Sequence, residues 1–111
     1  MKQAIPAKGD FITVSFDPQS GHEQKGRRPA LVVSNTAFNA HTGFAIVCPL
    51  TNTDRNYPFH VPITGNPAVK GFVMVEQAKS LDYKARSANI VGRASDELMG
   101  EVLSILDACL F

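Results

Sequence analysis

The sequence lacks the features that mark disulfide-rich, metal-binding, secreted and membrane proteins. It contains no tryptophan and only two cysteines, Cys48 and Cys109, which are far apart and each lie in an apolar run. Such a pair makes neither a disulfide framework nor a metal cluster, so we expect two reduced, packed thiols. No apolar run approaches membrane-spanning length, and residues 1–10 lack the hydrophobic core of a signal peptide. These absences predict a cytoplasmic protein with no membrane segment.

Positive and negative charges are nearly balanced, because the formal net charge is only +1. A protein that holds nucleic acid mainly through a large positive field is usually more basic. Any contact with nucleic acid would therefore have to come from a local cluster of cations. Apolar residues make up 44% of the chain and charged residues 19%, which is typical of a folded globule. The length of 111 residues predicts one domain, residues 1–111, without internal repeat or linker.

Runs rich in β-branched and aromatic residues, bounded by turn residues, predict short strands. The expected strands are residues 11–16, 30–34, 43–50, 59–63, 72–75 and 88–93. In the fourth of these, Phe59, Val61 and Ile63 fall on one face, with His60 and Pro62 on the other. Residues 35–41 offer about one helical turn, residues 80–84 a further turn, and Pro49 is expected at a strand end or edge.

A change of period near the C-terminus predicts an amphipathic helix capped by Ser95. Its apolar residues recur at intervals of three and four: Leu98, Val102, Ile105, Leu106, Cys109 and Leu110. Several short strands joined by turns, with one helix packed on the sheet, predict a mainly β fold. We expect a small, strongly twisted antiparallel barrel with a C-terminal α-helix.

Titratable and cationic side chains are concentrated in the loop between the first two expected strands. Five titratable or cationic residues share this loop: His22, Glu23, Lys25, Arg27 and Arg28. A loop held between fixed strands commonly presents binding groups, although an ordinary solvated hairpin loop has the same composition. The spacing of Gly21 and Gly26 is that of a phosphate-binding P-loop, but the Lys-Ser/Thr pair and the helix after it are missing. A second histidine for a zinc helix motif is also missing, so we predict no metal site.

Short stretches follow one another in a characteristic order: Asp17-Pro18, Gly21-His22-Glu23-Gln24, Gly26, Arg28-Pro29, Phe38-Asn39, Cys48-Pro49-Leu50-Thr51, Tyr57-Pro58-Phe59 and Glu76-Gln77-Ala78-Lys79-Ser80-Leu81-Asp82. This series covers nearly the whole chain and closely resembles the MazF/PemK family of toxin endoribonucleases. The resemblance implies a CcdB/MazF/PemK-like SH3-like barrel, usually a homodimer. It implies a sequence-specific mRNA interferase without a cofactor, acting as the toxin of a type II toxin–antitoxin system. The expected partner is a MazE-like antitoxin with an acidic, disordered tail that mimics RNA.

Cleavage of RNA by its own 2'-hydroxyl requires a base, an acid for the 5'-oxygen and fixed positive charge. Glu23 can act as the base, and Arg28 has a planar fork suited to phosphate oxygens. His22 titrates near neutrality and is the better acid on intrinsic grounds, so the acid stays open between His22 and Arg28. The resemblance implicates Glu23 and Arg28 in catalysis, Thr51 in some members and His22 in the PemK branch. The products would be a 2',3'-cyclic phosphate or 3'-phosphate and a 5'-hydroxyl.

Two departures concern the PemK branch, which has an arginine in place of Met74 and an aspartate in place of Glu76. That catalytic pair is not intact here, so we expect Glu76 to be structural, for example as an ion-pair partner of Arg28, ahead of a role in binding substrate. For Thr51, a turn cap is as plausible as a catalytic role.

A basic groove is expected if the loop folds toward residues 79–86. The candidate substrate-binding residues are Lys25, Arg27, Gln77, Lys79 and Arg86, with Lys84 beside them. The simpler interpretations are solubilising surface cations and, for Gln77, a buried amide that ties strands together. Tyr57 could stack on a base, whereas Phe59 is better placed in the core. Two alternative functions stay open: a toxin of the same fold that poisons DNA gyrase by contact, and an inactive RNA-binding barrel.

Overall fold

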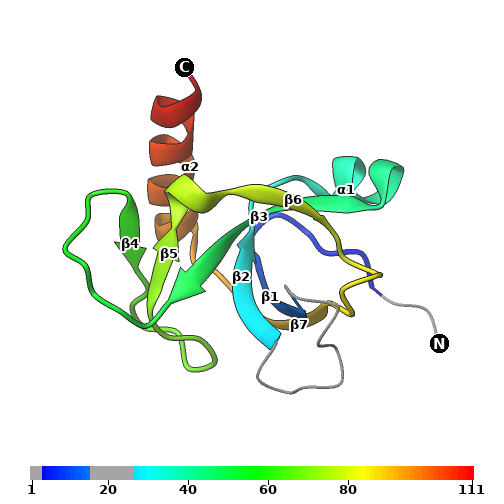
Figure 1. Cartoon of the computed structure of the whole chain (residues 1–111), viewed down its shortest axis with the longest axis horizontal. Coiled ribbons are helices and arrows are strands. Elements are labelled where there is room, and N and C mark those ends of the chain that lie inside the picture. Colours follow the sequence, from blue (N-terminus) through cyan, green and yellow to red (C-terminus); the bar gives the residue numbers. More distant parts are fainter. Residues whose placement is uncertain (1–3, 16–26) are drawn as a thin grey trace.

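The computed structural model describes residues 4–15 and 27–111 (Figure 1). Within them, seven strands form one antiparallel sheet in the order β4-β5-β3-β2-β1-β7, and β6 pairs with β3. The strands are β1 (Asp10–Ser15), β2 (Arg27–Val32), β3 (Phe44–Thr51), β4 (His60–Pro62), β5 (Phe72–Met74), β6 (Lys79–Asp82) and β7 (Asn89–Arg93). The helices are α1 (Thr36–Thr42), the 3-10 helix η3 (Val75–Gln77) and α2 (Asp96–Leu110).

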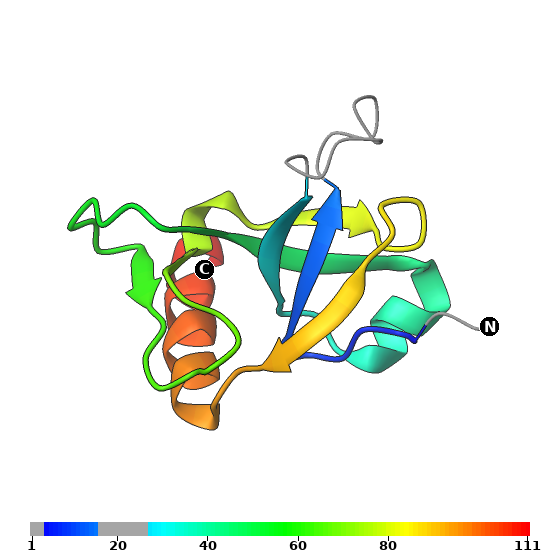
Figure 2. The ribbon, with the colours of Figure 1, turned by 90° about the horizontal axis from the view of Figure 1, so that it is seen from below.

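The sheet is strongly curved but open. Its strand order ends at β4 and β7, and no ladder in the described part of the chain joins these two strands. Figure 2 shows β1, β2 and β7 crossing the long strand β3, with α2 beside the β4–β5 end and α1 at the other end. The predicted mainly antiparallel β fold with a C-terminal helix is therefore confirmed, although the sheet does not close into a complete barrel.

Strand β3 runs through both halves of the fold and changes partner along one edge. Phe44–Val47 pairs with β6, and Leu50–Thr51 pairs with β5, while β2 occupies the opposite edge. Pro49, expected at a strand end or edge, lies inside β3 at this change of partner, the kind of ladder interruption that tolerates a residue without an N–H. The expected turn at residues 80–84 was wrong in part, because Lys79–Asp82 is strand β6. Its sequence signal is weak because only Leu81 of the four residues is buried.

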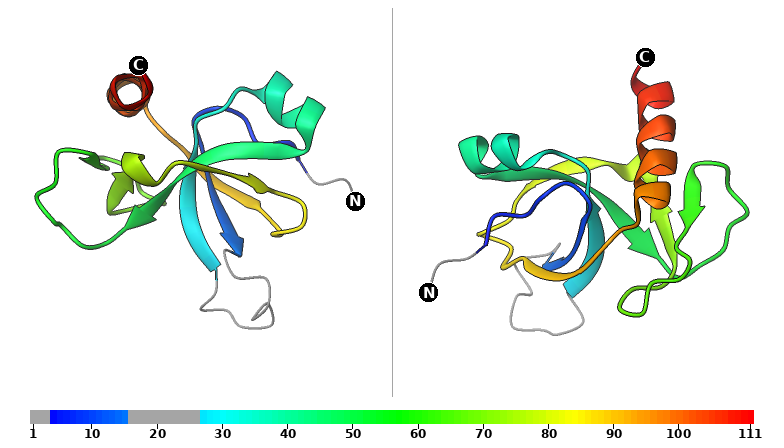
Figure 3. Two further views of the ribbon diagram at one scale, coloured as in Figure 1. Left: turned by 45° about the horizontal axis from the view of Figure 1, so that its top comes forward. Right: turned by 180° about the vertical axis from the view of Figure 1, so that it is seen from behind.

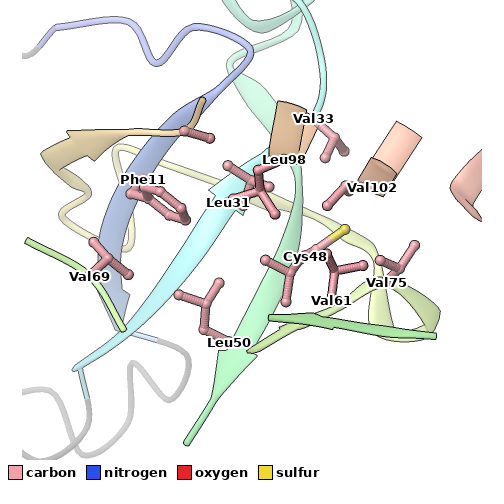
Figure 4. Packing of buried hydrophobic residues seen from close by; sticks show 12 residues of the cluster. Phe11, Leu31, Val33, Cys48, Leu50, Val61, Val69, Val75, Leu98 and Val102 are labelled. Carbon is pink, nitrogen blue, oxygen red and sulfur yellow. The ribbon is translucent and has the colours of Figure 1, made fainter. Parts of the chain in front are cut away.

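Both faces of the central strands are buried, which explains their nearly continuous apolar sequences. Successive residues of β1 and β2 alternate between two clusters, so Phe11 and Leu31 belong to one and Ile12 and Ala30 to the other. The first cluster lies beneath α2 and includes Val33, Cys48, Leu50, Val61, Val73, Val75, Leu98 and Val102 (Figure 4). The second cluster gathers Val14, Val32, Ala45, Val47, Leu81, Tyr83 and Ala88.

Helix α2 stands against the β4–β5 end of the sheet (Figure 3). The Ser95 side chain accepts a hydrogen bond from the Leu98 N–H at 3.1 Å, as predicted for the N-cap. Only the first half of the expected apolar face is fully covered, since Leu98 and Val102 are buried whereas Leu110 is 66% exposed. Cys109, expected to be packed, is exposed because it lies beyond the sheet edge on this last turn. In the described residues, no helix combines the length and apolarity needed to cross a membrane.

Candidate active site

Strand β2 begins three residues earlier than its apolar sequence indicates. Arg27 pairs with Ser15 and Arg28 with Val14 on β1, so both arginines are strand residues and were wrongly assigned to the loop. A regular ladder fixes their backbone at the end of the sheet. The candidate base Glu23, the candidate acid His22 and the cation Lys25 lie outside the described residues.

A cavity of about 250 Å³ opens where β2 and β3 end, lined by Arg27, Arg28, Pro29, Leu50, Thr51, Asn52 and Lys70. The β2–β3 register pairs Ala30 with Pro49, and two residues further along it Arg28 and Thr51 come to the same end of the sheet. The lining offers three cations, a hydroxyl and an amide, with no carboxylate among its described residues. Such a donor set suits a phosphate group.

Thr51 makes the turn-capping contact that was one of its two expected roles, and it also lies at the cavity. Its Oγ1 accepts a hydrogen bond from the Thr53 N–H at 3.2 Å, which is the turn-capping contact. The side chain also lines the cavity beside Arg28. Because a hydroxyl both accepts and donates, the capping bond leaves its proton available to a ligand.

Lys70 is a cavity residue that the sequence reasoning missed. Gly71 follows it with φ +114°, and a Cβ at Gly71 would lie 2.5 Å from the Thr51 carbonyl oxygen. The Gly71 carbonyl in turn accepts from the Ile63 N–H at 2.9 Å. Because glycine alone fits this close approach, it lets the connection from β4 to β5 press against Thr51 and bring Lys70 to the cavity.

The turn between β6 and β7 holds both strand ends that flank residues 16–26. Arg86 donates from Nη1 to the Ser15 carbonyl at 2.9 Å, and the Ser15 N–H donates to the Arg86 carbonyl at 3.1 Å. Arg27 donates from Nη2 to the Ser87 carbonyl at 2.7 Å. The structure therefore places Arg27 and Arg86 at this turn, where the Arg86 guanidinium donates to the Ser15 backbone. The expected basic groove also needs residues that lie outside the described part of the chain, so it stays a prediction. Lys79 is exposed on β6 and is not among the residues that line the Arg28 cavity.

Glu76 does not hold Arg28, as one expectation had it. Its Oε2 lies 3.0 Å from Nε2 of His60, which projects from the neighbouring strand β4. Gln77 is exposed, and its Nε2 donates to Glu76 Oε2 at 3.5 Å, so the buried-amide interpretation was wrong. The charge of Glu76, together with the larger effect of burial, raises the pKa of the Cys48 thiol to about 12.

A second cavity, of about 390 Å³, adjoins this pair and is lined by Asp54, Asn56, Tyr57, Pro58, His60, Pro62 and Phe72. Phe72 pairs with Thr51 on one side and with Pro62 on the other, so one cross-strand row connects the two cavities. Tyr57 is 44% exposed and meets the His60 ring edge-on at a centroid distance of 5.0 Å. Across residues 4–15 and 27–111, no group of three or more His, Cys, Asp or Glu side chains gathers to hold a metal ion.

The family described as PemK-like, MazF-like toxin of type II toxin-antitoxin system matches residues 7–110. The chain belongs to this family. Among its relatives, the endoribonuclease toxin ChpB of Escherichia coli K12 is 44% identical, covering 97% of each chain. The endoribonuclease toxin MazF of the same strain is 39% identical over 84% of this chain and 83% of its own.

Solved structures of the family share the fold. MazF from Deinococcus radiodurans superposes with a TM-score of 0.86 at 38% identity, covering 97% of this chain and 98% of that one. A MazE-MazF structure from the same organism has a TM-score of 0.86 at 32% identity, with 97% of each chain covered. The resemblance inferred from the loop motif is therefore confirmed, and the fold of this family member is that of MazF.

Proposed function

We propose that this member of the PemK-like, MazF-like family cleaves single-stranded RNA without a metal ion, as the toxin of a type II toxin–antitoxin pair. The observation that carries the proposal is the cavity in which Arg28, Lys70 and Thr51 meet at the end of β2 and β3. Relatives at 39% and 44% identity are named endoribonucleases, which supports the same reaction class here. The substrate in the cell is mRNA, and the consequence is inhibited translation and growth.

The cavity supplies the electrostatic part of the reaction. The Arg28 guanidinium carries a permanent positive charge and can donate two parallel hydrogen bonds to non-bridging phosphate oxygens. These bonds strengthen as negative charge grows on the phosphorane-like transition state, which lowers its free energy relative to the bound substrate. Thr51 can donate its hydroxyl proton to the same phosphate. No carboxylate among the described lining residues opposes the approach of RNA.

Proton transfer completes the reaction. In our proposal Glu23 removes the proton of the 2'-hydroxyl, the 2'-oxygen attacks phosphorus, and the bond to the 5'-oxygen breaks. His22 or Arg28 provides the proton that the 5'-oxygen takes up. The products are a 2',3'-cyclic phosphate, which water can open to a 3'-phosphate, and a 5'-hydroxyl.

The proposed partner is an antitoxin. MazE-MazF structures are among the neighbours of this fold, which supports a MazE-like partner here. An acidic, disordered antitoxin tail would compete with RNA for the cationic cavity and so hold the toxin inactive. We further propose that the toxin is a homodimer and acts in the cytoplasm, where mRNA is found.

The test is cleavage of an unstructured RNA in excess EDTA. Wild-type protein is expected to cut it, Arg28→Ala to abolish cutting with the fold preserved, and Glu23→Ala to reduce the rate at least about tenfold. Lys8→Met, which removes an exposed cation outside the cavity, serves as the charge-matched control and should cut normally. Full activity in Arg28→Ala, or dependence on added magnesium, contradicts the mechanism.

Two further measurements refine the assignment. In His22→Gln, loss of one limb of the bell-shaped pH–rate profile would identify His22 as the acid, and an unchanged profile would leave that role to Arg28.

Supercoiling by DNA gyrase is expected to continue in the presence of the protein. Inhibited supercoiling with intact RNA would favour a gyrase-binding toxin instead.

A further inference from the structure

A second cationic cavity lies on the other side of Arg27. It has a volume of about 290 Å³ and is lined by Arg27, Lys84, Ser87, Ala88 and Asn89, from the start of β2, the β6–β7 turn and the start of β7. Arg27 lines this cavity and the Arg28 cavity alike. The two cavities are therefore neighbours that share Arg27 as a lining residue.

The Arg27 side chain is held in place by uncharged acceptors. Its Nη2 donates to the Thr13 carbonyl at 2.8 Å, to Thr13 Oγ1 at 3.1 Å and to the Ser87 carbonyl at 2.7 Å. These three contacts orient the guanidinium between β1 and the β6–β7 turn, and none of the three described acceptors carries a negative charge. A fixed cation that loses little side-chain entropy on binding is well suited to hold an anion.

The turn that carries Lys84 is also well fixed. The Ala85 N–H donates to Asp82 Oδ1 at 3.0 Å, and the Ser87 N–H donates to the Lys84 carbonyl at 3.0 Å. Ser87 has φ +54°, a left-handed conformation that is uncommon for a residue with a side chain. Residues held in such a conformation concentrate at functional sites, and here it is Ser87 whose carbonyl orients Arg27.

We infer that the Arg27–Lys84 cavity binds a second phosphate of the RNA strand, next to the phosphate that is cleaved. The inference rests on the proposed ribonuclease function. It places the path of the strand outside the Arg28 cavity, past Arg27 and toward the β6–β7 turn. Lys84 and Arg27 provide the charge, while the Ser87 hydroxyl and the Asn89 amide can donate to phosphate oxygens or to a ribose 2'-hydroxyl. An RNA backbone that runs past Arg27 therefore meets cations in both cavities.

The test compares Lys84→Met with wild type and with Lys8→Met as the charge-matched control. Two RNAs share the mapped cleavage word: a short one with two flanking nucleotides on each side, and a long one with six. On the long RNA, Lys84→Met is expected to lower kcat/KM by about threefold to tenfold and to reduce the slope of log kcat/KM against log salt by about 0.7. The loss on the short RNA should be smaller, and Lys8→Met should match wild type on both.

Binding separates this inference from the proposed function. The long RNA with a 2'-deoxyribose at the cleaved position cannot be cut, so its Kd can be measured by fluorescence anisotropy at several salt concentrations. If the wild-type protein cuts no RNA, an unstructured RNA of the same length replaces this ligand, and a lower salt slope in Lys84→Met still supports the second phosphate site. An unchanged slope on the long RNA overturns the site while leaving cleavage untouched. Weakened binding of an acidic peptide with unchanged RNA binding also overturns it, because the cavity would then serve a protein partner.

Discussion

His60 and Glu76 form a contact of 3.0 Å between Nε2 and Oε2 that joins β4 to η3. The His60 side chain is only 4% exposed, whereas that of Glu76 is 27% exposed, so the pair has one buried and one partly hydrated member. This contact gives Glu76 a structural partner, which is the kind of role that the sequence favoured for it ahead of substrate binding.

Substitutions in this pair should change stability more than rate. His60→Ala removes a buried ring and leaves the Glu76 carboxylate without its partner, so the free energy of unfolding should fall by about 2–3 kcal/mol. Glu76→Gln keeps a side-chain acceptor and should cost about 1 kcal/mol. Urea unfolding measures both, and RNA cleavage under folding conditions should stay within a few-fold of wild type for Glu76→Gln. A loss of cleavage with unchanged stability would instead give Glu76 a role in binding or cleaving the RNA.

Gly71→Ala should damage both the fold and the cavity. The added Cβ would lie 2.5 Å from the Thr51 carbonyl oxygen, at a φ of +114° that side chains rarely adopt. We expect at least about 2 kcal/mol of destabilisation and reduced cleavage, because Thr51 and Lys70 would separate. Gly100→Ala is the matched control, since that position in α2 has open space and alanine should stabilise it by about 0.5–1 kcal/mol. Equal stability of the two variants in a thermal melt would refute the close approach.

Lys70→Met should weaken catalysis while the fold is retained. The side chain is exposed, and its loss removes one of the three cations among the described residues that line the Arg28 cavity. If Lys70 contacts the phosphate mainly in the transition state, kcat should fall by about tenfold at an unchanged KM. Steady-state kinetics on a short RNA distinguishes this from simple binding, which would raise KM alone. Lys70→Arg should restore much of the rate, and wild-type kinetics in Lys70→Met would remove the residue from the site.

The two cysteines should differ in reactivity and in their effect on alkaline stability. Burial, with a smaller effect of Glu76, raises the pKa of Cys48 from its ordinary value of 9.0 to about 12. Between pH 9 and pH 12 the unfolded chain therefore loses this proton while the native protein keeps it, so the native state loses about 1.4 kcal/mol per pH unit. Urea unfolding at several alkaline pH values should show this slope in wild type and its absence in Cys48→Ala.

Alkylation provides an independent check on the same assignment. Cys109 is exposed and should react with iodoacetamide in the native protein, whereas Cys48 should react only after unfolding. Mass spectrometry of the native protein after short exposure would show this difference. Equal labelling of both residues would mean that Cys48 is accessible, and the predicted alkaline slope would then be absent as well.

The sequence predicted the apolar parts of this fold well and the polar parts poorly. Helix α2 was identified from its Ser95 N-cap and from the spacing of apolar residues such as Leu98 and Val102. Both signals come from residues close together in the sequence. Strand β6 was missed because Lys79 and Ser80 are exposed and its pairing with Phe44–Val47 is a contact between distant segments. Arg27 and Arg28 were placed in a loop for a similar reason, since their strand character comes from Ser15 and Val14 on β1.

Only those residues of the candidate site that belong to the family motifs were predicted from the sequence. Arg28 and Thr51 were both recognised, and the structure brings them to one cavity. Lys70 was missed because nothing in its neighbourhood distinguishes it from a surface lysine. Its place follows from the positive φ of Gly71 and from the Thr51 backbone, which are properties of the folded chain. The His60 partner of Glu76 was missed for the same reason.

The β6–β7 turn grips Ser15 through Arg86 and Arg27 through Ser87, so the two ends of the intervening segment are anchored independently of what that segment contains. Substitutions within residues 16–26 that spare Glu23 and His22 should consequently leave the backbone of Arg28 on β2 in place. Selectivity for a particular RNA word can then be varied within that segment while the arginine supplied by β2 stays the same.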